Sequence, residues 1–84
     1  MLPGMKSKRK KLEIGAVIRE FRQTAGLSQD QLAVRMDLST PYVSMLESGK
    51  RYPSIEMLVC VALALDIRPG IMLERVVERN GRKL

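Results

Sequence analysis

The chain has 84 residues, enough for one small domain with a single hydrophobic core. Three aromatic residues, one cysteine and no histidine argue against a base-stacking platform, a disulfide framework and a zinc cluster. The net charge of +6 lies at the ends, because residues 1–12 carry +5, residues 79–84 carry +3 and residues 13–78 carry −2. The longest apolar run has nine residues, far short of the roughly 20 that span a bilayer. With no signal-peptide pattern and no disulfides, we expect a cytoplasmic protein.

The two ends of the chain are predicted to lie outside the folded domain. Residues 1–11 form a basic arm without apolar periodicity, and residues 80–84 form a basic tail, which leaves residues 12–79 for the domain. The cations of the arm are Lys6, Lys8, Arg9, Lys10 and Lys11. Such an arm either follows DNA phosphates or a minor groove, as homeodomain arms do, or is only a solvated tail.

A regular apolar face predicts a first helix that begins near residue 14. Its members, the first followed by residues three, four, seven and eleven positions later, are Ile14, Val17, Ile18, Phe21 and Ala25. Gly26 ends this helix, since glycine tolerates the left-handed conformation that follows a last turn. Ser28 and Gln31 then form a capping box for a short second helix over residues 29–36.

A break at residues 37–39 separates the second helix from a third. Either Ser39 or Thr40 caps this third helix, and Pro41 suits its first turn because no amide partner is needed there. Two helices joined by so short a turn have helix-turn-helix spacing. The apolar side of the third helix packs inward, which leaves its other face free to enter a DNA major groove.

Two more helices complete an all-α domain of five short helices. The apolar residues 57–65 predict a buried fourth helix with Cys60 as a small core residue. The fifth helix, residues 71–79, has an apolar surface too broad for one narrow stripe. We expect Met72 and Val76 to be exposed in a monomer and to mark a dimer interface, the alternative being a helix wholly absorbed by its own core.

Several fragments of the sequence fall in an order and spacing typical of one family. They are Ile14-Gly15, Arg22, Gly26-Leu27-Ser28-Gln29, Leu32-Ala33, Leu38-Ser39, Leu46-Glu47-Ser48-Gly49-Lys50-Arg51, Pro53 and Leu63-Ala64-Leu65-Asp66-Ile67. In these the chain resembles the phage Cro/repressor-like, or XRE-type, helix-turn-helix domains over about residues 14–76. The resemblance implies a compact, lambda-repressor-like fold and sequence-specific binding of double-stranded DNA.

The resemblance also implies roles for individual residues. The DNA-binding residues that it implies on the recognition helix are Thr40, Pro41, Tyr42, Ser44 and Met45, with Tyr42 either touching the DNA backbone or packing. The phosphate-binding residues that it implies are Gln29, Ser39, Ser48, Lys50 and Arg51. Arg22 and Glu47 match a family ion pair, largely buried, that orients the recognition helix.

The sequence departs from the family pattern in two ways. Asp37 stands at the turn where the family usually has glycine, and aspartate tolerates the left-handed region better than most residues. The recognition face lacks the Arg, Asn and Gln side chains that read guanine and adenine with two hydrogen bonds. We therefore expect modest direct readout, with DNA shape and deformability supplying much of the specificity.

The functional hypothesis is a bacterial or phage transcriptional regulator that binds DNA as a homodimer. No cofactor, metal ion, small-molecule ligand or membrane contact is expected. The alternative is an antitoxin-like module that binds a protein partner, with weak or secondary DNA binding. Enzyme function is not expected, since the sequence has no histidine, no glycine-rich phosphate loop, no metal-ligand spacing and no activated-nucleophile pattern.

Overall fold

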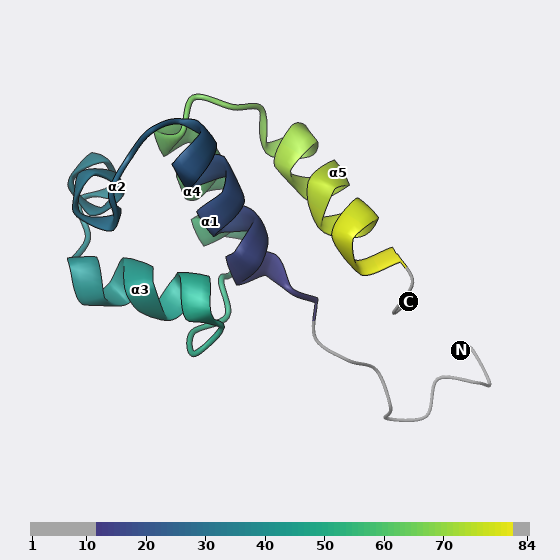
Figure 1. Cartoon of the computed structure of the whole chain (residues 1–84), viewed down its shortest axis with the longest axis horizontal. Coiled ribbons are helices and arrows are strands. Elements are labelled where there is room, and N and C mark those ends of the chain that lie inside the picture. The colour runs from purple at the N-terminus through teal and green to yellow at the C-terminus, as the bar shows by residue number, and fades with distance from the viewer. Residues whose placement is uncertain (1–11, 82–84) are drawn as a thin grey trace.

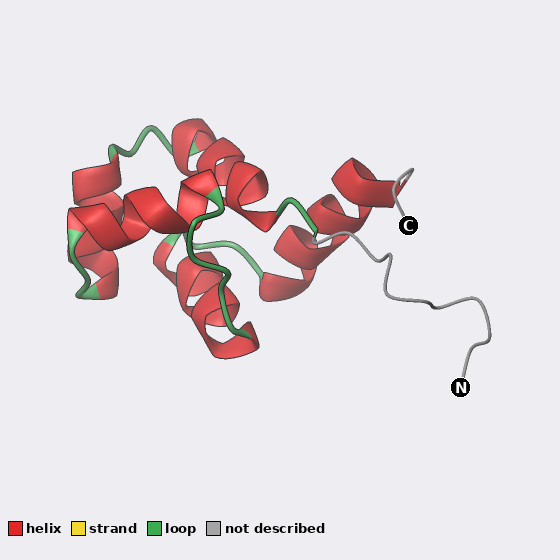
Figure 2. Ribbon diagram, turned by 90° about the horizontal axis from the view of Figure 1, so that it is seen from below, coloured by secondary structure: helices red, strands yellow, loops and turns green. Residues whose placement is uncertain are grey.

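The computed structural model describes residues 12–81, which contain five α-helices and no strand (Figures 1 and 2). The helices are α1 (Ile14–Thr24), α2 (Gln29–Met36), α3 (Thr40–Ser48), α4 (Ile55–Ala64) and α5 (Pro69–Asn80). The predicted all-α domain of five short helices is confirmed. None of these helices is long and apolar enough to cross a membrane. The predicted arm at residues 1–11 and residues 82–84 of the predicted tail lie outside the described residues.

Local side-chain caps set the ends of α2 and α3. Before α2, the Ser28 hydroxyl accepts from the Gln31 amide at 3.0 Å, and the Ser28 amide donates to Gln31 Oε1 at 2.8 Å. Before α3, the Ser39 hydroxyl accepts from the Tyr42 amide at 3.2 Å, which decides between the two predicted caps. Gly49 ends α3 with φ of 86°.

The hydrophobic core forms where α1 packs on α3 and α5, while α2 packs on α3 and α4. Figure 1 shows α2 and α3 at one end of the molecule, α5 at the other, and α1 and α4 between them. The largest fully buried apolar side chains are Val17, Ile18, Leu32, Val43, Leu46, Val61, Met72 and Val76. The helix-turn-helix pair α2 and α3 is thus supported from behind by α1 and α4.

The prediction that Met72 and Val76 are exposed is wrong, because both side chains are fully buried in the core. Asn80, one further turn along the same face of α5, explains this rotation of the helix. It is fully buried, its Oδ1 accepts from the Glu13 amide at 2.8 Å and its Nδ2 donates to the Val76 carbonyl at 2.8 Å. Asn80 therefore belongs to the folded body and not to the tail.

The apolar residues that α5 does expose are Ile71, Leu73 and Val77. Met72 and Val76 are consequently not candidates for a dimer interface in the folded monomer.

The helix α4 is less buried than its apolar run predicts. Cys60 is exposed, so its expected place in the core is wrong. The buried face of α4 consists of Leu58, Val61 and Ala62. Val59 and Leu63 lie exposed, since a helix packed on one side buries only one stripe. Ala25, expected on the inward face of the first helix, is exposed too, because α1 ends at Thr24.

Candidate nucleic-acid interface

The helix α3 has one buried face and one accessible face. Val43 and Leu46 are buried at 0% and 1% exposure and anchor the helix. The five side chains predicted to contact DNA, Thr40, Pro41, Tyr42, Ser44 and Met45, are all partly or fully exposed. Asp37 closes the turn between α2 and α3 in the left-handed conformation, with φ of 57°. The turn therefore forms although it lacks glycine.

A buried carboxylate joins α3 to α1. The Glu47 side chain is fully buried and accepts from Arg22 Nε at 2.6 Å and from Arg22 Nη2 at 3.0 Å. This bidentate pair confirms the ion pair that the family resemblance implies. Arg22 Nη1 also donates to the Leu27 carbonyl at 2.7 Å, which ties the turn before α2 to the same guanidinium.

The hydrogen bonds to Glu47 outweigh the cost of its burial. Burial alone raises the pKa of Glu47, but donors from Arg22, Gln29 and Arg19 together lower that pKa below its ordinary value. The same pairing with Glu47 raises the pKa of Arg22. Both groups are thus charged at neutral pH, and the pair holds the last turn of α3 against α1.

Two further donors meet at one oxygen of Glu47. Gln29 Nε2 donates to Glu47 Oε1 at 3.0 Å, and Arg19 Nε donates to the same atom at 3.3 Å. A side-chain amide carries two N–H groups, so Gln29 keeps a second donor for another partner. This carboxylate therefore connects α1, α2 and α3.

Sequence analysis missed Arg19, although its three-residue spacing from Arg22 places both on one face of α1. The Arg19 side chain is 49% exposed, and its terminal amino groups make no hydrogen bond within residues 12–81. Two guanidinium groups on one carboxylate leave a net charge of +1 beside Gln29.

The backbones of α1 and α3 come into direct contact at Gly15. A Cβ atom there would lie 2.4 Å from the Leu46 carbonyl oxygen and 2.5 Å from the Glu47 carbonyl oxygen. The absence of a side chain at Gly15 therefore sets the distance between α1 and the last turn of α3.

A second contact that sequence analysis missed links the two helices of the helix-turn-helix. The Thr40 hydroxyl, at the start of α3, donates to Asp30 Oδ1 in the first turn of α2. The hydroxyl of a predicted base-contacting residue thus already has a partner within the protein.

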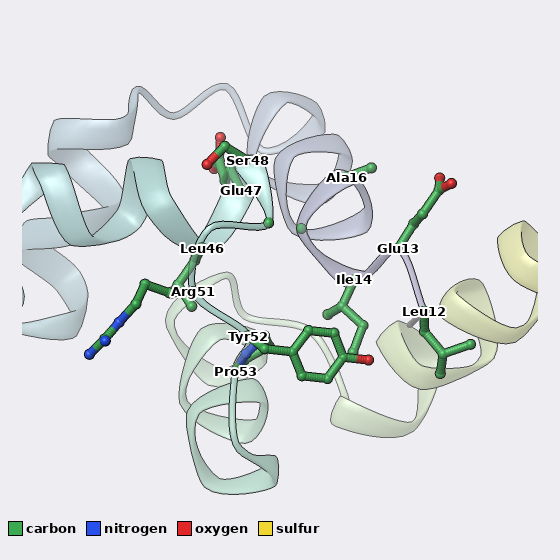
Figure 3. A pocket seen from close by; sticks show the side chains of 12 residues that line it. Leu12, Glu13, Ile14, Ala16, Leu46, Glu47, Ser48, Arg51, Tyr52 and Pro53 are labelled. Carbon is green, nitrogen blue, oxygen red and sulfur yellow. The ribbon is translucent and has the colours of Figure 1, made fainter. Parts of the chain in front are cut away.

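The end of α3 and the segment that follows it carry the exposed residues Ser48, Lys50 and Arg51. Figure 3 shows this segment beside the start of α1, across a pocket of about 350 Å³ that Leu12 and Glu13 also line. The Arg51 side chain extends away from the start of α1, and its guanidinium carbon lies 5.6 Å from the centre of the Tyr42 ring. Residue 12, where the predicted arm joins the domain, therefore lines the same pocket as Arg51.

Comparison with known proteins agrees with this geometry. Residues 18–71 match the model of a family described as helix-turn-helix, from the middle of α1 to the start of α5. The chain belongs to the helix-turn-helix family. The fold and the resemblance expected from the sequence are thereby confirmed.

Relatives of this helix-turn-helix protein include regulators from several bacteria. An uncharacterized HTH-type transcriptional regulator of Mycobacterium tuberculosis is 41% identical over 61 residues, which are 73% of this chain and 44% of the relative. The restriction-modification controller protein C.AhdI from Aeromonas hydrophila superposes with a TM-score of 0.67 at 38% identity, over 73% of this chain and 92% of the controller. The clp gene regulator ClgR from C. glutamicum gives a TM-score of 0.76 at 31% identity, over 80% and 87%. The chain spans less than half the length of the M. tuberculosis relative.

Proposed function

We propose that this helix-turn-helix protein is a transcriptional regulator that binds double-stranded DNA sequence-specifically, with α3 in the major groove. The observation that carries the proposal is that α3 is held firmly against the rest of the domain while its outer face stays accessible. Its inner face is buried, its last turn is fixed to α1 through Glu47, and its outer face is left accessible. A recognition helix needs this arrangement, because a base is distinguished only by side chains held at fixed positions. The names of the relatives, which are regulators and a controller protein, support it.

Base contacts come from the first two turns of α3. Thr40 and Ser44 each make single hydrogen bonds, while Pro41 and Met45 touch thymine methyl groups. None of these side chains forms the paired hydrogen bonds of arginine or glutamine, so direct readout is modest and DNA shape contributes specificity.

Phosphate contacts surround this face. Gln29 offers its second amide hydrogen, Ser39 offers its hydroxyl group, and Lys50 and Arg51 bind as cations. The Ser48 hydroxyl donates to the Met45 carbonyl at 3.2 Å and contacts a phosphate by exchanging that partner. The excess positive charge at Arg19 adds a further phosphate contact next to Gln29. Tyr42 contacts the DNA backbone and supports Arg51 through its ring.

The basic arm continues this surface. Its cations, Lys6, Lys8, Arg9, Lys10 and Lys11, precede residue 12, which lines the same pocket as Arg51. Each phosphate that a protein neutralises contributes about −0.9 to the slope of log affinity against log salt concentration. The arm supplies affinity that is independent of base sequence and sensitive to salt.

The protein acts as a homodimer through the exposed apolar side of α5. Leu73 and Val77, one turn apart, line an open groove of about 530 Å³, with Glu74 and Glu78 at its margin. A second copy that covers this groove with its own Leu73 and Val77 removes the apolar surface of both chains from water. The dimer would present two recognition helices to half-sites about 34 Å apart on a pseudo-palindromic site.

The decisive experiment selects bound sequences from a random DNA pool at two salt concentrations. A palindromic motif that persists at the higher salt supports the regulator. Weak, salt-labile binding without a motif refutes sequence-specific recognition and favours the protein-interaction module.

A second experiment compares the full chain with a variant that lacks residues 1–11. We expect the salt slope to flatten by roughly 2–4 units per protomer, while the selected motif stays the same. Arg68→Ala serves as a control, since this exposed cation lies at the start of α5, away from α3. A slope that the deletion leaves unchanged would make the arm a solvated tail.

The dimer is tested by analytical ultracentrifugation of the wild type, Leu73→Glu and Val34→Glu. Val34 is an exposed apolar residue of α2 and controls for the added charge. We expect only Leu73→Glu to be monomeric at tens of micromolar. A wild type that is monomeric in solution and does not dimerise on DNA would refute the dimer proposal.

A further inference from the structure

The hydrogen bond between Thr40 and Asp30 has a fixed direction. A carboxylate has acceptor oxygens only, so the Thr40 hydroxyl must donate its one hydrogen to Asp30 Oδ1. The Thr40 oxygen is then left with lone pairs and no hydrogen to offer. Thr40 is the first residue of α3, at the end of the helix that enters the major groove in the proposed complex.

We infer that Asp30 makes Thr40 an acceptor-only reader, which selects a base with an amino group in the major groove. This inference rests on the proposed function. Adenine presents its N6 amino group and cytosine its N4 amino group, and each can donate to the Thr40 oxygen. Guanine and thymine present acceptor oxygens at the equivalent positions, and these would face the lone pairs of Thr40 without a hydrogen between them.

The chemistry of the interface keeps this hydrogen bond in place on DNA. Asp30 is exposed in the first turn of α2, beside Gln29, where the proposed complex brings a phosphate. A carboxylate that is brought close to phosphates and loses water needs a donor, and Thr40 is the side-chain donor it has within residues 12–81. A hydrogen bond to a charged acceptor is also stronger than one between neutral groups.

The expected effect is confined to one base position in each half-site. A single hydrogen bond is worth about fivefold in affinity, so the wild type should prefer adenine or cytosine there by about fivefold over guanine or thymine. A structural role of the same contact would instead weaken binding to every sequence alike, because it would loosen α2 against α3.

The experiment measures base preference at every position of the selected motif, by competition among single-base variants of the site. It compares the wild type with Asp30→Ala, Asp30→Asn and Thr40→Val. Asp30→Ala frees the hydroxyl to rotate and donate, and Asp30→Asn lets the carboxamide donate to the Thr40 oxygen. Thr40→Val removes the hydroxyl at nearly constant shape. Asp37→Asn is the charge-matched control, because Asp37 lies in the turn and the Thr40 hydroxyl donates to Asp30 instead.

We expect all three variants at positions 30 and 40 to lose the preference at one base position and to keep it elsewhere, whereas Asp37→Asn keeps the wild-type preference throughout. An Asp30→Ala protein whose motif is the same as that of the wild type overturns the inference and leaves the proposed function standing. A wild type that selects no motif refutes the proposed function itself. A uniform loss of affinity with unchanged preferences overturns the inference in favour of a structural role.

Discussion

Replacing Gly15 with alanine tests whether the close approach of α1 and α3 holds the recognition helix in place. The new Cβ atom would meet the Leu46 and Glu47 carbonyl oxygens at 2.4 and 2.5 Å, whereas ordinary contacts begin at 3.4 Å. The two helices would have to separate by about 1 Å, since backbone oxygens cannot rotate out of the way.

The cost follows from that displacement. Forcing extra atoms into a packed interface costs about 1–3 kcal/mol, and a collision with backbone lies at the upper end. The higher helix propensity of alanine stabilises the fold by about 0.5–1 kcal/mol relative to glycine. We expect a net loss of about 2 kcal/mol, which for a domain of this size lowers the melting temperature by about 8–16 °C.

Urea denaturation of Gly15→Ala and of Gly81→Ala provides the assay. Gly81 is exposed, has helical φ and ψ angles of −55° and −37°, and would place its Cβ in open space, so its replacement should change stability by less than about 0.5 kcal/mol. Gly15→Ala should also bind the selected DNA site more weakly, because the last turn of α3 moves. Equal stability of the two variants would refute the argument that Gly15 sets the helix spacing.

Three further predictions concern the Glu47 cluster and the turn. Arg22→Met should lower the free energy of unfolding by about 3–5 kcal/mol because it leaves Glu47 charged and buried. The double variant Arg22→Met/Glu47→Gln should lose less stability than the sum of the two single variants. Urea denaturation of the three variants measures these losses. The pKa of Glu47 is lower in the folded protein than its unfolded value of 4.5, so ionised Glu47 stabilises the fold fully above pH 4.5. This stabilisation disappears as the pH falls through the folded pKa. The free energy of unfolding of Glu47→Gln should therefore change less between pH 6 and 3 than that of the wild type. Asp37→Gly should raise the melting temperature, since glycine adopts φ of 57° without strain; a lower value would contradict this.

Features governed by near neighbours in the chain were predictable from the sequence. The capping box of Ser28 and Gln31 involves residues three apart, and the structure forms both of its hydrogen bonds. The bounds of α2 and the left-handed turn at Asp37 follow from the same kind of local pattern. The Arg22–Glu47 pair was implied by the family resemblance, and its geometry confirms it.

Features that depend on distant parts of the chain were not predictable. The buried face of α5 contains Met72, Val76 and Asn80, and the hydrogen-bond partner of Asn80, Glu13, lies 67 residues away in sequence. Arg19 joins the Glu47 cluster across 28 residues. The helix α4 is apolar on more than one side, so its composition does not show which side faces the core. Cys60 was for this reason predicted to be buried, whereas it is exposed.

The basic residues of the folded domain differ from those of the chain ends, because several of the domain's arginines are paired with carboxylates. Within residues 12–81, Arg22, Arg75 and Arg79 pair with the carboxylates of Glu47, Glu20 and Glu13, so their charges are largely neutralised before DNA approaches. The cations near α3 that remain for phosphates are Arg19, Lys50 and Arg51. The hydrogen bond from the Glu13 amide to Asn80 also places residues 13 and 80 side by side. In the proposed complex, we therefore expect the basic ends to set the affinity and its salt dependence, and α3 with its few neighbouring cations to set the choice of DNA site.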